Sequence, residues 1–385
     1  MLSFGSKMMN LLKVTFISFF VLAIVSCAMQ QETQSKKLDN KGLFPFLQNG
    51  KWGFIDKTGK VMIKPQFDNI ISDGYCPASD FSEGLNVVKV GGKYGYINEK
   101  GEFAINPQFD YAGVFSEGLA KVTLNGKTGF IDKTGKFIIN PRFDSEFYLT
   151  PSSPFTSASG ERNFWYDGEG FSEGLAVVNI GHYEYIDGNT NATIDTTGYN
   201  YVDKKGETVD YGPFVQAQEF SEGLALISRG VGKPFFITKS GNGKKAFDTE
   251  FDEAGSFSEG LAVIRNASGK GYIDTSGKIV ISPQFEVAEG FQEGLACVGV
   301  GKYPTTKFGF IDKTGKFVIN PQFSACGNYA SLGGFSDGLA IVKVIENGSE
   351  KLVYINKTGE IVIRPQTSTA CEFMNGLAPV VIEGK

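Results

Sequence analysis

Short runs in which apolar and polar residues alternate recur along most of the chain. In LAKVTL, residues 119–124, every second side chain from Ala120 onwards is apolar, which is the period expected of a half-buried strand. Asn125 and Gly126 follow, and because both residue types tolerate positive φ, this pair is a strong signal of a two-residue hairpin turn. The stretch therefore predicts a strand, a tight turn and a returning strand.

The segment after that turn predicts two strands. GFID, residues 129–132, and KFIIN, residues 136–140, are separated by a KTG turn in which Gly135 is expected to adopt positive φ. Pro141 then ends the third strand, because proline has no N–H to donate to a neighbouring strand. One unit is thus predicted to be a three-stranded antiparallel meander.

A five-residue motif, FSEGL or a close variant, recurs along the chain. It begins at eight phenylalanines: Phe81, Phe115, Phe171, Phe220, Phe257, Phe291, Phe335 and Phe373. A catalytic site needs unlike groups at one place, whereas this carboxylate returns with each unit at repeat-like spacing. We therefore interpret the motif as structural. We expect its phenylalanine to fill the gap between units, its serine to bond its own backbone, its carboxylate to accept from turn amides and its glycine to adopt positive φ.

Residues 42–385 are consequently predicted to form an all-β array of tandem meanders with about eight units. Residues 42–51 and 376–385 match one another as first strands, so one spare strand remains. We favour a propeller-like ring because an open array exposes more strand edge. An open β-solenoid is the alternative.

The repeated segments resemble a known family. KWGFIDKTGKVMIKPQFD, residues 51–68, is similar to the WG-containing repeat of bacterial proteins, whose Trp-Gly pair corresponds to Trp52 and Gly53. Related segments begin at Lys93, Gly271, Phe308 and Val353, and the tryptophan itself does not recur in them. The resemblance implies a β-rich scaffold without an assigned activity and with no catalytic residues to carry over.

The first 27 residues indicate a targeting signal. Basic residues precede an apolar run of about a dozen residues, which is too short to span a bilayer as a helix. The run ends at Cys27 in a segment that resembles the bacterial lipobox, which implies acylation of this cysteine. Polar residues 28–41 are expected to form a flexible tether. The chain is therefore predicted to be exported and lipid-anchored in the cell envelope, at the outer membrane or cell surface.

Charge and histidine content narrow the possible chemistry. Lys and Arg number 37 against 42 Asp and Glu, with no basic run, so nucleic acid is not expected as a partner. His182 is the single histidine, which disfavours a catalytic triad or a histidine-rich metal site. We expect no cofactor, metal or catalytic residue. The alternative is a hydrolase or lyase that uses Asp167, Glu169 or His182.

One region of the chain does not follow the repeat pattern. Residues 145–170 form an insertion rich in Ser, Pro and aromatic residues, and the following unit, 174–222, is divergent and rich in tyrosine. Long loops on a rigid scaffold are where binding function concentrates, and exposed aromatic rings suit protein or glycan ligands. The binding candidates are Trp165, Tyr166, Tyr183 and Tyr185.

Four cysteines remain besides Cys27, and they allow three complete pairings that the sequence does not rank. Cys297 lies in an apolar strand and is interpreted as a small buried residue. Cys326 and Cys371 occupy nearly equivalent places in successive units. We expect these two to be neighbours and a possible disulfide, since export exposes them to an oxidising compartment.

Overall fold

The computed structural model describes residues 42–56, 58–70, 81–145, 170–186, 193–230, 232–327 and 334–365. The chain divides into two compact units, residues 1–42 and 43–385. Apart from Gly42, every described residue belongs to the second unit. The fold is all-β: the described residues form 31 strands in seven antiparallel sheets.

The strands follow the repeats along the chain. Units one to three contain β1 (Phe44–Gln48), β2 (Lys51–Ile55), β3 (Val61–Phe67), β4 (Asn69–Ile70), β5 (Leu85–Val90), β6 (Lys93–Asn98), β7 (Phe103–Phe109), β8 (Tyr111–Ala112), β9 (Ala120–Leu124), β10 (Lys127–Ile131) and β11 (Phe137–Asp144). Units four and five contain β12 (Phe171–Ser172), β13 (Leu175–Ile186), β14 (Thr193–Asp203), β15 (Thr208–Phe214), β16 (Gln216–Ala217), β17 (Leu224–Ser228) and β18 (Phe235–Thr238). Units six to eight contain β19 (Glu253–Ala254), β20 (Leu261–Asn266), β21 (Gly269–Asp274), β22 (Ile279–Phe285), β23 (Val287–Ala288), β24 (Ala296–Val300), β25 (Lys307–Ile311), β26 (Phe317–Phe323), β27 (Ala325–Cys326), β28 (Phe335–Ser336), β29 (Leu339–Glu346), β30 (Ser349–Asn356) and β31 (Ile361–Ile363).

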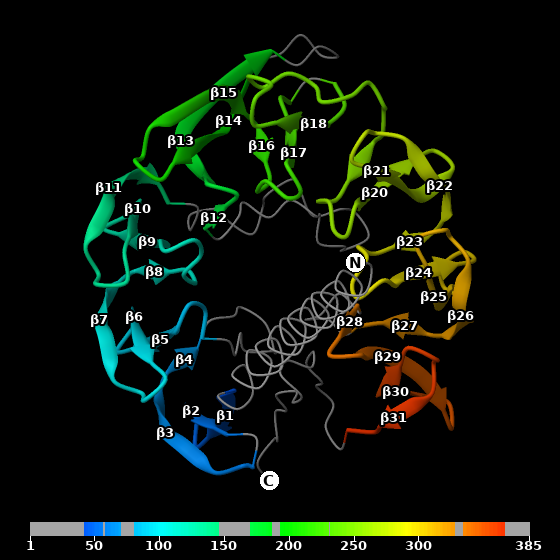
Figure 1. The fold of residues 1–385 in the computed structure, drawn as a ribbon, viewed down its shortest axis with the longest axis horizontal. Helices are drawn as coiled ribbons and strands as arrows, with labels where there is room; N and C mark the ends of the chain where they lie inside the picture. The colour runs from blue at the N-terminus through cyan, green and yellow to red at the C-terminus, as the bar shows by residue number, and fades with distance from the viewer. Residues whose placement is uncertain are drawn as a thin grey trace, which may run out of the picture. The chain divides into compact units, whose positions relative to one another are not determined.

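The meanders pair in chain order, as the sequence predicts, except that among the described residues of the fifth unit only an isolated bridge between Ile237 and Lys245 stands in place of a third strand. In the third unit β9 pairs with β10 and β10 with β11. A two-residue strand from the end of the preceding unit, here β8, adds to the free edge of β9. Within the unit of residues 43–385 the sheets follow one another in a ring-like succession, with β3, β7 and β26 on the outside (Figure 1). Among the described residues, no strand pairing joins β1–β3 to the sheet of β27–β31.

The glycine of the Trp-Gly pair is required by a close backbone approach. The register between second and third strands shifts at this glycine, so the third strand bulges over it. A Cβ atom on Gly129 would lie 2.6 Å from the carbonyl oxygen of Ile139 and 2.7 Å from the nitrogen of Pro141. The equivalent glycines have the same surroundings: Gly53, Gly95, Gly271 and Gly309. In these five units, only a residue without a side chain fits beneath the bulge.

The second turn is built around an aspartate. Asp132 Oδ1 accepts hydrogen bonds from the amide and hydroxyl of Thr134 at 2.9 and 2.6 Å and from the amide of Lys136 at 3.1 Å. The hydroxyl bond is the main cause of the lowered pKa of the Asp132 carboxyl. Gly135 has φ of 85°, as predicted. The same turn recurs at Asp56, Asn98, Asp274, Asp312 and Asn356.

The hydrophobic core lies between successive units. One cluster combines Tyr96 and Ile105 of the second unit with Phe115 and Val122 of the third. The Phe115 ring lies 4.8 Å from the Tyr96 ring, centroid to centroid. The same contact recurs along the array in the pairs Phe171 with Phe130, Phe220 with Tyr201, Phe257 with Phe236, Phe291 with Tyr272 and Phe335 with Phe310. The motif phenylalanine thus fills the gap between units.

Adding one methyl group beneath the bulge should destabilise the array. Gly129→Ala places a Cβ against backbone atoms that cannot move independently, so we expect a loss of about 1–3 kcal/mol in the free energy of unfolding. Gly255→Ala is the matched control, because Gly255 has negative φ and no atom within 4 Å of its Cβ position. Urea unfolding measures both variants. Equal stabilities would contradict the steric requirement.

Candidate functional site

The recurring motif forms a tight hairpin turn. In the third unit the backbones of Ser116 and Leu119 exchange two hydrogen bonds of 2.9 and 3.1 Å. Between them, Glu117 has φ of 53° and Gly118 has φ of 86°, as in a type I′ turn. Positive φ is strained for a glutamate, yet every described copy of the motif has a carboxylate residue there: Glu83, Glu117, Glu173, Glu222, Glu259, Glu293 and Asp337.

The motif glutamate bonds to the turn of the next unit. The Glu83 carboxylate accepts a 3.1 Å hydrogen bond from the amide of Gly118 and lies 2.9 Å from the ammonium of Lys133. Lys133 also donates to the carbonyl oxygen of Glu83 at 2.9 Å. The same carboxylate and lysine contacts recur in the pairs Glu117 with Lys204, Glu173 with Lys239, Glu259 with Lys313 and Glu293 with Lys357.

The predicted hydrogen-bond partner of the motif serine is wrong. Ser116 was expected to bond its own backbone, but its hydroxyl donates to the carbonyl oxygen of Phe171, the first residue of the next motif, at 2.6 Å. Equivalent bonds link Ser82 with Phe115, Ser172 with Phe220, Ser221 with Phe257 and Ser258 with Phe291. Serine, glutamate and phenylalanine of one motif therefore all contact an adjacent unit.

The electrostatics of the motif are those of an ion pair. The hydrogen bond from Lys133 holds the pKa of the Glu83 carboxyl below its usual value. At Glu173, burial raises the carboxyl pKa, but the hydrogen bond from Lys239 and the amide bond of the next turn together lower it. These carboxylates are charged at neutral pH and paired, so they hold neighbouring units together.

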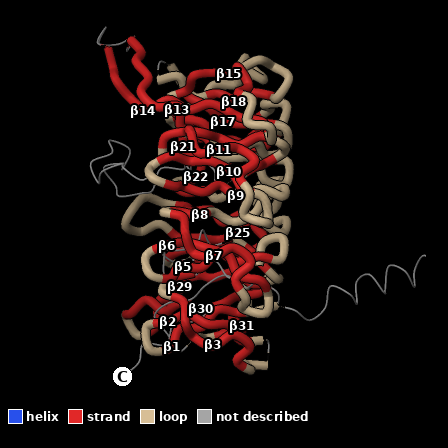
Figure 2. Tube along the Cα trace, turned by 90° about the vertical axis from the view of Figure 1, so that its left-hand side faces the viewer, coloured by secondary structure: helices blue, strands red, loops and turns tan. Residues whose placement is uncertain are grey.

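The first hairpin of the fourth unit is much longer than the repeat requires, with strands of 12 and 11 residues. Its strands β13 and β14 extend beyond the sheet as a two-stranded ribbon, which we define as residues 180–186 and 193–197 (Figure 2). Pairing runs from Gly181 opposite Gly198 to Ile186 opposite Thr193. Residues 180–186 pair with no described strand other than β14, and residues 193–197 with none other than β13. Along both outer edges of the ribbon, the backbone N–H and C=O groups therefore take part in no pairing with a further described strand.

One face of the ribbon carries two of the predicted binding residues. The rings of Tyr183 and Tyr185 stack at 6.4 Å between centroids with an interplanar angle of 25°. Tyr185 also lies against the fifth unit, since a Cβ on Gly230 would be 2.5 Å from its Cζ atom. Both tyrosines are half-buried. The ribbon therefore holds a pair of aromatic rings in a fixed arrangement.

The opposite face of the ribbon is exposed and carries both ionisable and apolar side chains. The Nδ1 atom of His182 lies 3.0 Å from Oδ1 of Asp195, and this hydrogen bond raises the pKa of the imidazole. Ile186, on the same face, is 62% exposed. Asp167 and Glu169, the other residues of the hydrolase alternative, lie outside the described residues. So do Cys27, Trp165 and Tyr166.

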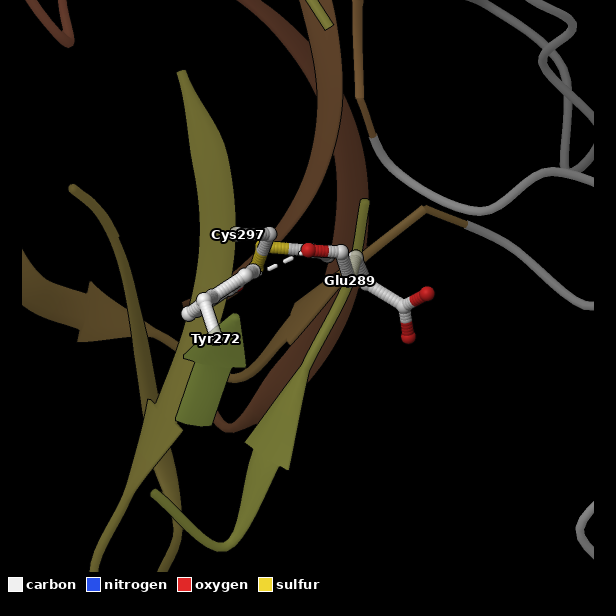
Figure 3. Close-up of a disulfide and its surroundings, with 4 residues drawn as sticks. Tyr272, Glu289 and Cys297 are labelled. Carbon is white, nitrogen blue, oxygen red and sulfur yellow. Dashed lines mark hydrogen bonds between the residues drawn. A yellow bond between two sulfur atoms is a disulfide. The ribbon is translucent and has the colours of Figure 1, made fainter. Parts of the chain in front are cut away.

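The disulfide differs from the predicted one. Cys297 in β24 is bonded to Cys326 in β27, with 6.5 Å between Cα atoms (Figure 3). Beside it, the Tyr272 hydroxyl donates to the carbonyl oxygen of Glu289 at 2.8 Å. Cys297 is thus buried but not a lone thiol, and Cys326 is not free to pair with Cys371, which lies outside the described residues. The two sulfurs meet because β24 and β27 contribute to the same inter-unit cluster.

The described residues contain no cluster of three or more His, Cys, Asp or Glu side chains that could hold a metal ion. Within the same part of the chain, no helix is both long and apolar enough to cross a membrane.

Sequence comparison identifies the repeats. The WG containing repeat matches residues 52–94, 94–127, 129–145, 240–269, 271–303, 308–347 and 354–385, which is more than half of the chain. The chain belongs to the WG containing repeat family. Residues 146–239, which include the ribbon, fall outside the matched segments. No curated protein matches the sequence.

Solved structures with related folds are distant in sequence. A eukaryotic initiation factor aligns with 10% identity and a TM-score of 0.43, covering 84% of this chain and 96% of its own. Dipeptidyl peptidase 4 of Porphyromonas gingivalis aligns with 8% identity and a TM-score of 0.47, covering 88% and 62%. An oligogalacturonate lyase in complex with manganese aligns with 10% identity and a TM-score of 0.34, covering 84% and 96%. At these values the matches carry no argument about function.

Acid should weaken the contacts between units of this WG repeat protein. The pKa values of Glu83, Glu173 and Glu259 are lowered on folding, so their stabilisation is fully present above the ordinary value of 4.5 and is lost as the pH falls through the folded-state values. The thermal midpoint should therefore decrease below about pH 4.5. A variant with glutamine at all three positions should show a smaller decrease. Parallel pH profiles for the two proteins would contradict this account.

One motif glutamate, Glu222, has no lysine at the equivalent position of the next unit. Glu222 accepts from the amide of Gly260 at 2.9 Å, but Thr275 stands at the position from which Lys133, Lys204, Lys239, Lys313 and Lys357 contact a motif glutamate. Thr275→Lys should stabilise the chain by about 0.3–1 kcal/mol, the range of a partly exposed ion pair. Lys313→Thr, the reverse change in the next turn, should cost a similar amount. Urea unfolding that leaves both variants at wild-type stability would refute a contribution from these lysines.

Proposed function

We propose that this chain is a non-enzymatic, membrane-anchored lipoprotein whose β-repeat array is a scaffold for binding a protein or glycan. The observation that carries this proposal is the ribbon of the fourth unit. Its stacked pair, Tyr183 and Tyr185, lies on the extension of β13 beyond the rest of the sheet. Rigid aromatic residues on such an extension provide contact area at a low cost in conformational entropy.

A protein partner is favoured over a glycan by the edges of the ribbon. A two-stranded ribbon whose outer edges pair with no further described strand can accept a strand from a partner, and main-chain hydrogen bonds then supply affinity. The exposed Ile186 adds an apolar side chain beside that edge. The stacked tyrosines alone would also suit the apolar face of a sugar, so a glycan is the second candidate.

Attachment to the membrane rests on the N-terminal segment. The lipobox-like sequence ending at Cys27 supplies an acylation site, and residues 28–41 supply a polar spacer before the array. The disulfide between Cys297 and Cys326 supports export, because such bonds persist in oxidising compartments. Together these features favour the outer membrane or cell surface.

The non-enzymatic character is argued from how the acidic residues are used. The motif carboxylates, which recur like a catalytic group, are engaged by amides and lysines of the next unit. A side chain that holds two units together cannot leave that contact during a reaction without weakening the fold. The exposed pair of His182 and Asp195 lies on a ribbon rather than in an enclosed site.

The proposal is tested in the native membrane. We expect that cross-linking the full-length chain captures a protein partner, and that Tyr183→Ala combined with Tyr185→Ala reduces its recovery by roughly tenfold, as for two central contact residues. Tyr303→Ala is the matched control, since Tyr303 is 89% exposed and belongs to the loop between β24 and β25 of the seventh unit. Purified wild-type chain is applied to a glycan array in parallel.

The outcomes separate the alternatives. Equal recovery from the double variant and the control would remove the ribbon from the binding site. If the wild-type chain binds a glycan on the array and the double variant does not, the ligand of the ribbon is a glycan and not a protein. Cys27→Ser should transfer the chain from the membrane to the soluble fraction, and retention at the membrane would contradict the lipid anchor.

A further inference from the structure

The fifth unit carries two cations beyond the ion pair that the repeat supplies. In the first three units a lysine of the first hairpin pairs with an aspartate at the end of the third strand: Lys51 with Asp68, Lys93 with Asp110 and Lys127 with Asp144. In the fifth unit Lys233 makes the equivalent contact with Asp252, at 3.3 Å between Nζ and Oδ1. Arg229 and Lys245 are exposed, and neither forms a salt bridge with a carboxylate that the structure describes. Their positive charge is therefore additional to that of the repeat.

Both cations are held by aromatic rings. The Cζ atom of Arg229 lies 5.7 Å from the centroid of the Phe214 ring and 5.6 Å from that of Phe235, distances at which a cation is attracted to a ring face. Its Nη2 atom also donates a 2.9 Å hydrogen bond to the carbonyl oxygen of Gly243. The Nζ atom of Lys245 lies 5.7 Å from the same Phe235 ring. The arginine is thus fixed while exposed, and its guanidinium has further N–H groups in the planar fork that suits a carboxylate.

The two cations lie beside the ribbon. Phe214, which contacts Arg229, is paired in the sheet with Tyr199, just beyond the end of the ribbon. The ring of Tyr185 lies against Gly230, the residue that follows Arg229. Strands β14 and β17 of the fourth and fifth units contribute to one core cluster at this junction (Figure 1). The stacked tyrosines and the two cations therefore belong to one continuous surface.

We propose that this surface binds an acidic segment of a partner protein, whose carboxylates contact Arg229 and Lys245 while its backbone lies along the ribbon. This inference rests on the proposed function and adds the chemical class of the partner. The chain as a whole has a net charge of −5, so it has no general attraction for acidic polymers and the positive charge is local. A peptide is favoured over an acidic glycan because a strand added to the ribbon presents every second side chain on one face, where two carboxylates can meet two cations.

Labelled peptides test the contact. In fluorescence anisotropy, the full-length chain in detergent should bind a peptide of alternating glutamate and threonine, more weakly at high salt, and should not bind one of alternating lysine and threonine. Arg229→Gln combined with Lys245→Gln should raise the Kd by roughly tenfold. The matched control is Lys302→Gln combined with Lys307→Gln, which removes the same charge from exposed residues of the corresponding hairpin in the seventh unit and should leave the Kd unchanged.

A second variant separates binding from folding. Lys245→Gln alone leaves the contacts of Arg229 with Phe214 and Gly243 in place, so it should keep the wild-type melting curve in circular dichroism and still weaken binding of the acidic peptide. A double variant that binds as tightly as its control would overturn the proposal. Equal binding of the acidic and the basic peptide would overturn it as well.

Two further measurements separate this inference from its alternatives. If the chain binds polygalacturonate through Arg229 and does not bind the acidic peptide, the ligand is an acidic glycan and the proposal is overturned. In the native membrane, a partner whose cross-linking depends on Tyr183 and Tyr185 but not on Arg229 and Lys245 would overturn the acidic contact and leave the proposed function in place. If no partner is captured but the acidic peptide still binds through Arg229, the acidic contact stands and the proposed function is refuted.

Discussion

The array depends on hydrogen bonds that each motif turn makes with the next turn. Glu117 adopts positive φ, a conformation that costs about 1–3 kcal/mol for a residue with a side chain. Glycine would adopt it without strain but would have no carboxylate. The strained residue is kept because its carboxylate reaches the amide of Gly174 and the ammonium of Lys204 in the next unit. The motif is therefore a connector, and its composition is set by the neighbouring unit rather than by its own hairpin.

The residue types of the Trp-Gly pair that gives the family its name are also determined by packing. Its tryptophan position accepts tyrosine, threonine, lysine or phenylalanine, because the side chain there packs at the start of a strand. Its glycine recurs at Gly53, Gly95 and Gly129 because the bulge of the third strand leaves no room for a Cβ. The proline that follows the bulge also removes an N–H from the outer strand, which limits edge-to-edge association. One backbone geometry thus serves both close packing and protection of the edge.

Local features were predictable from the sequence, and partners in other units were not. The Asn-Gly hairpin and the positive φ of Gly135 follow from turn chemistry within a few residues, and the structure confirms both. The hydroxyl of Ser116 bonds a carbonyl 55 residues away, and Cys297 bonds Cys326 across two units. Such partners depend on the position of one meander relative to the next. The periodicity of the sequence gives no information about that relative position. For the ribbon, the tyrosines were identifiable by composition, but their stacking required knowledge of strand register.

Where this protein can contact other molecules follows from how the repeats use their surfaces. Within the array, the units contribute their motif, their second turn and, in five of them, a third-strand isoleucine to their neighbours, so these groups are occupied. The fourth unit keeps the motif contact, from Glu173 to Lys239 of the fifth unit, and still lengthens its strands. Extension of a hairpin beyond the sheet adds surface without disturbing the interfaces on either side. Recognition is therefore expected to evolve where strands extend beyond the repeat, because a substitution in the motif or in the second turn alters a contact that holds two units together.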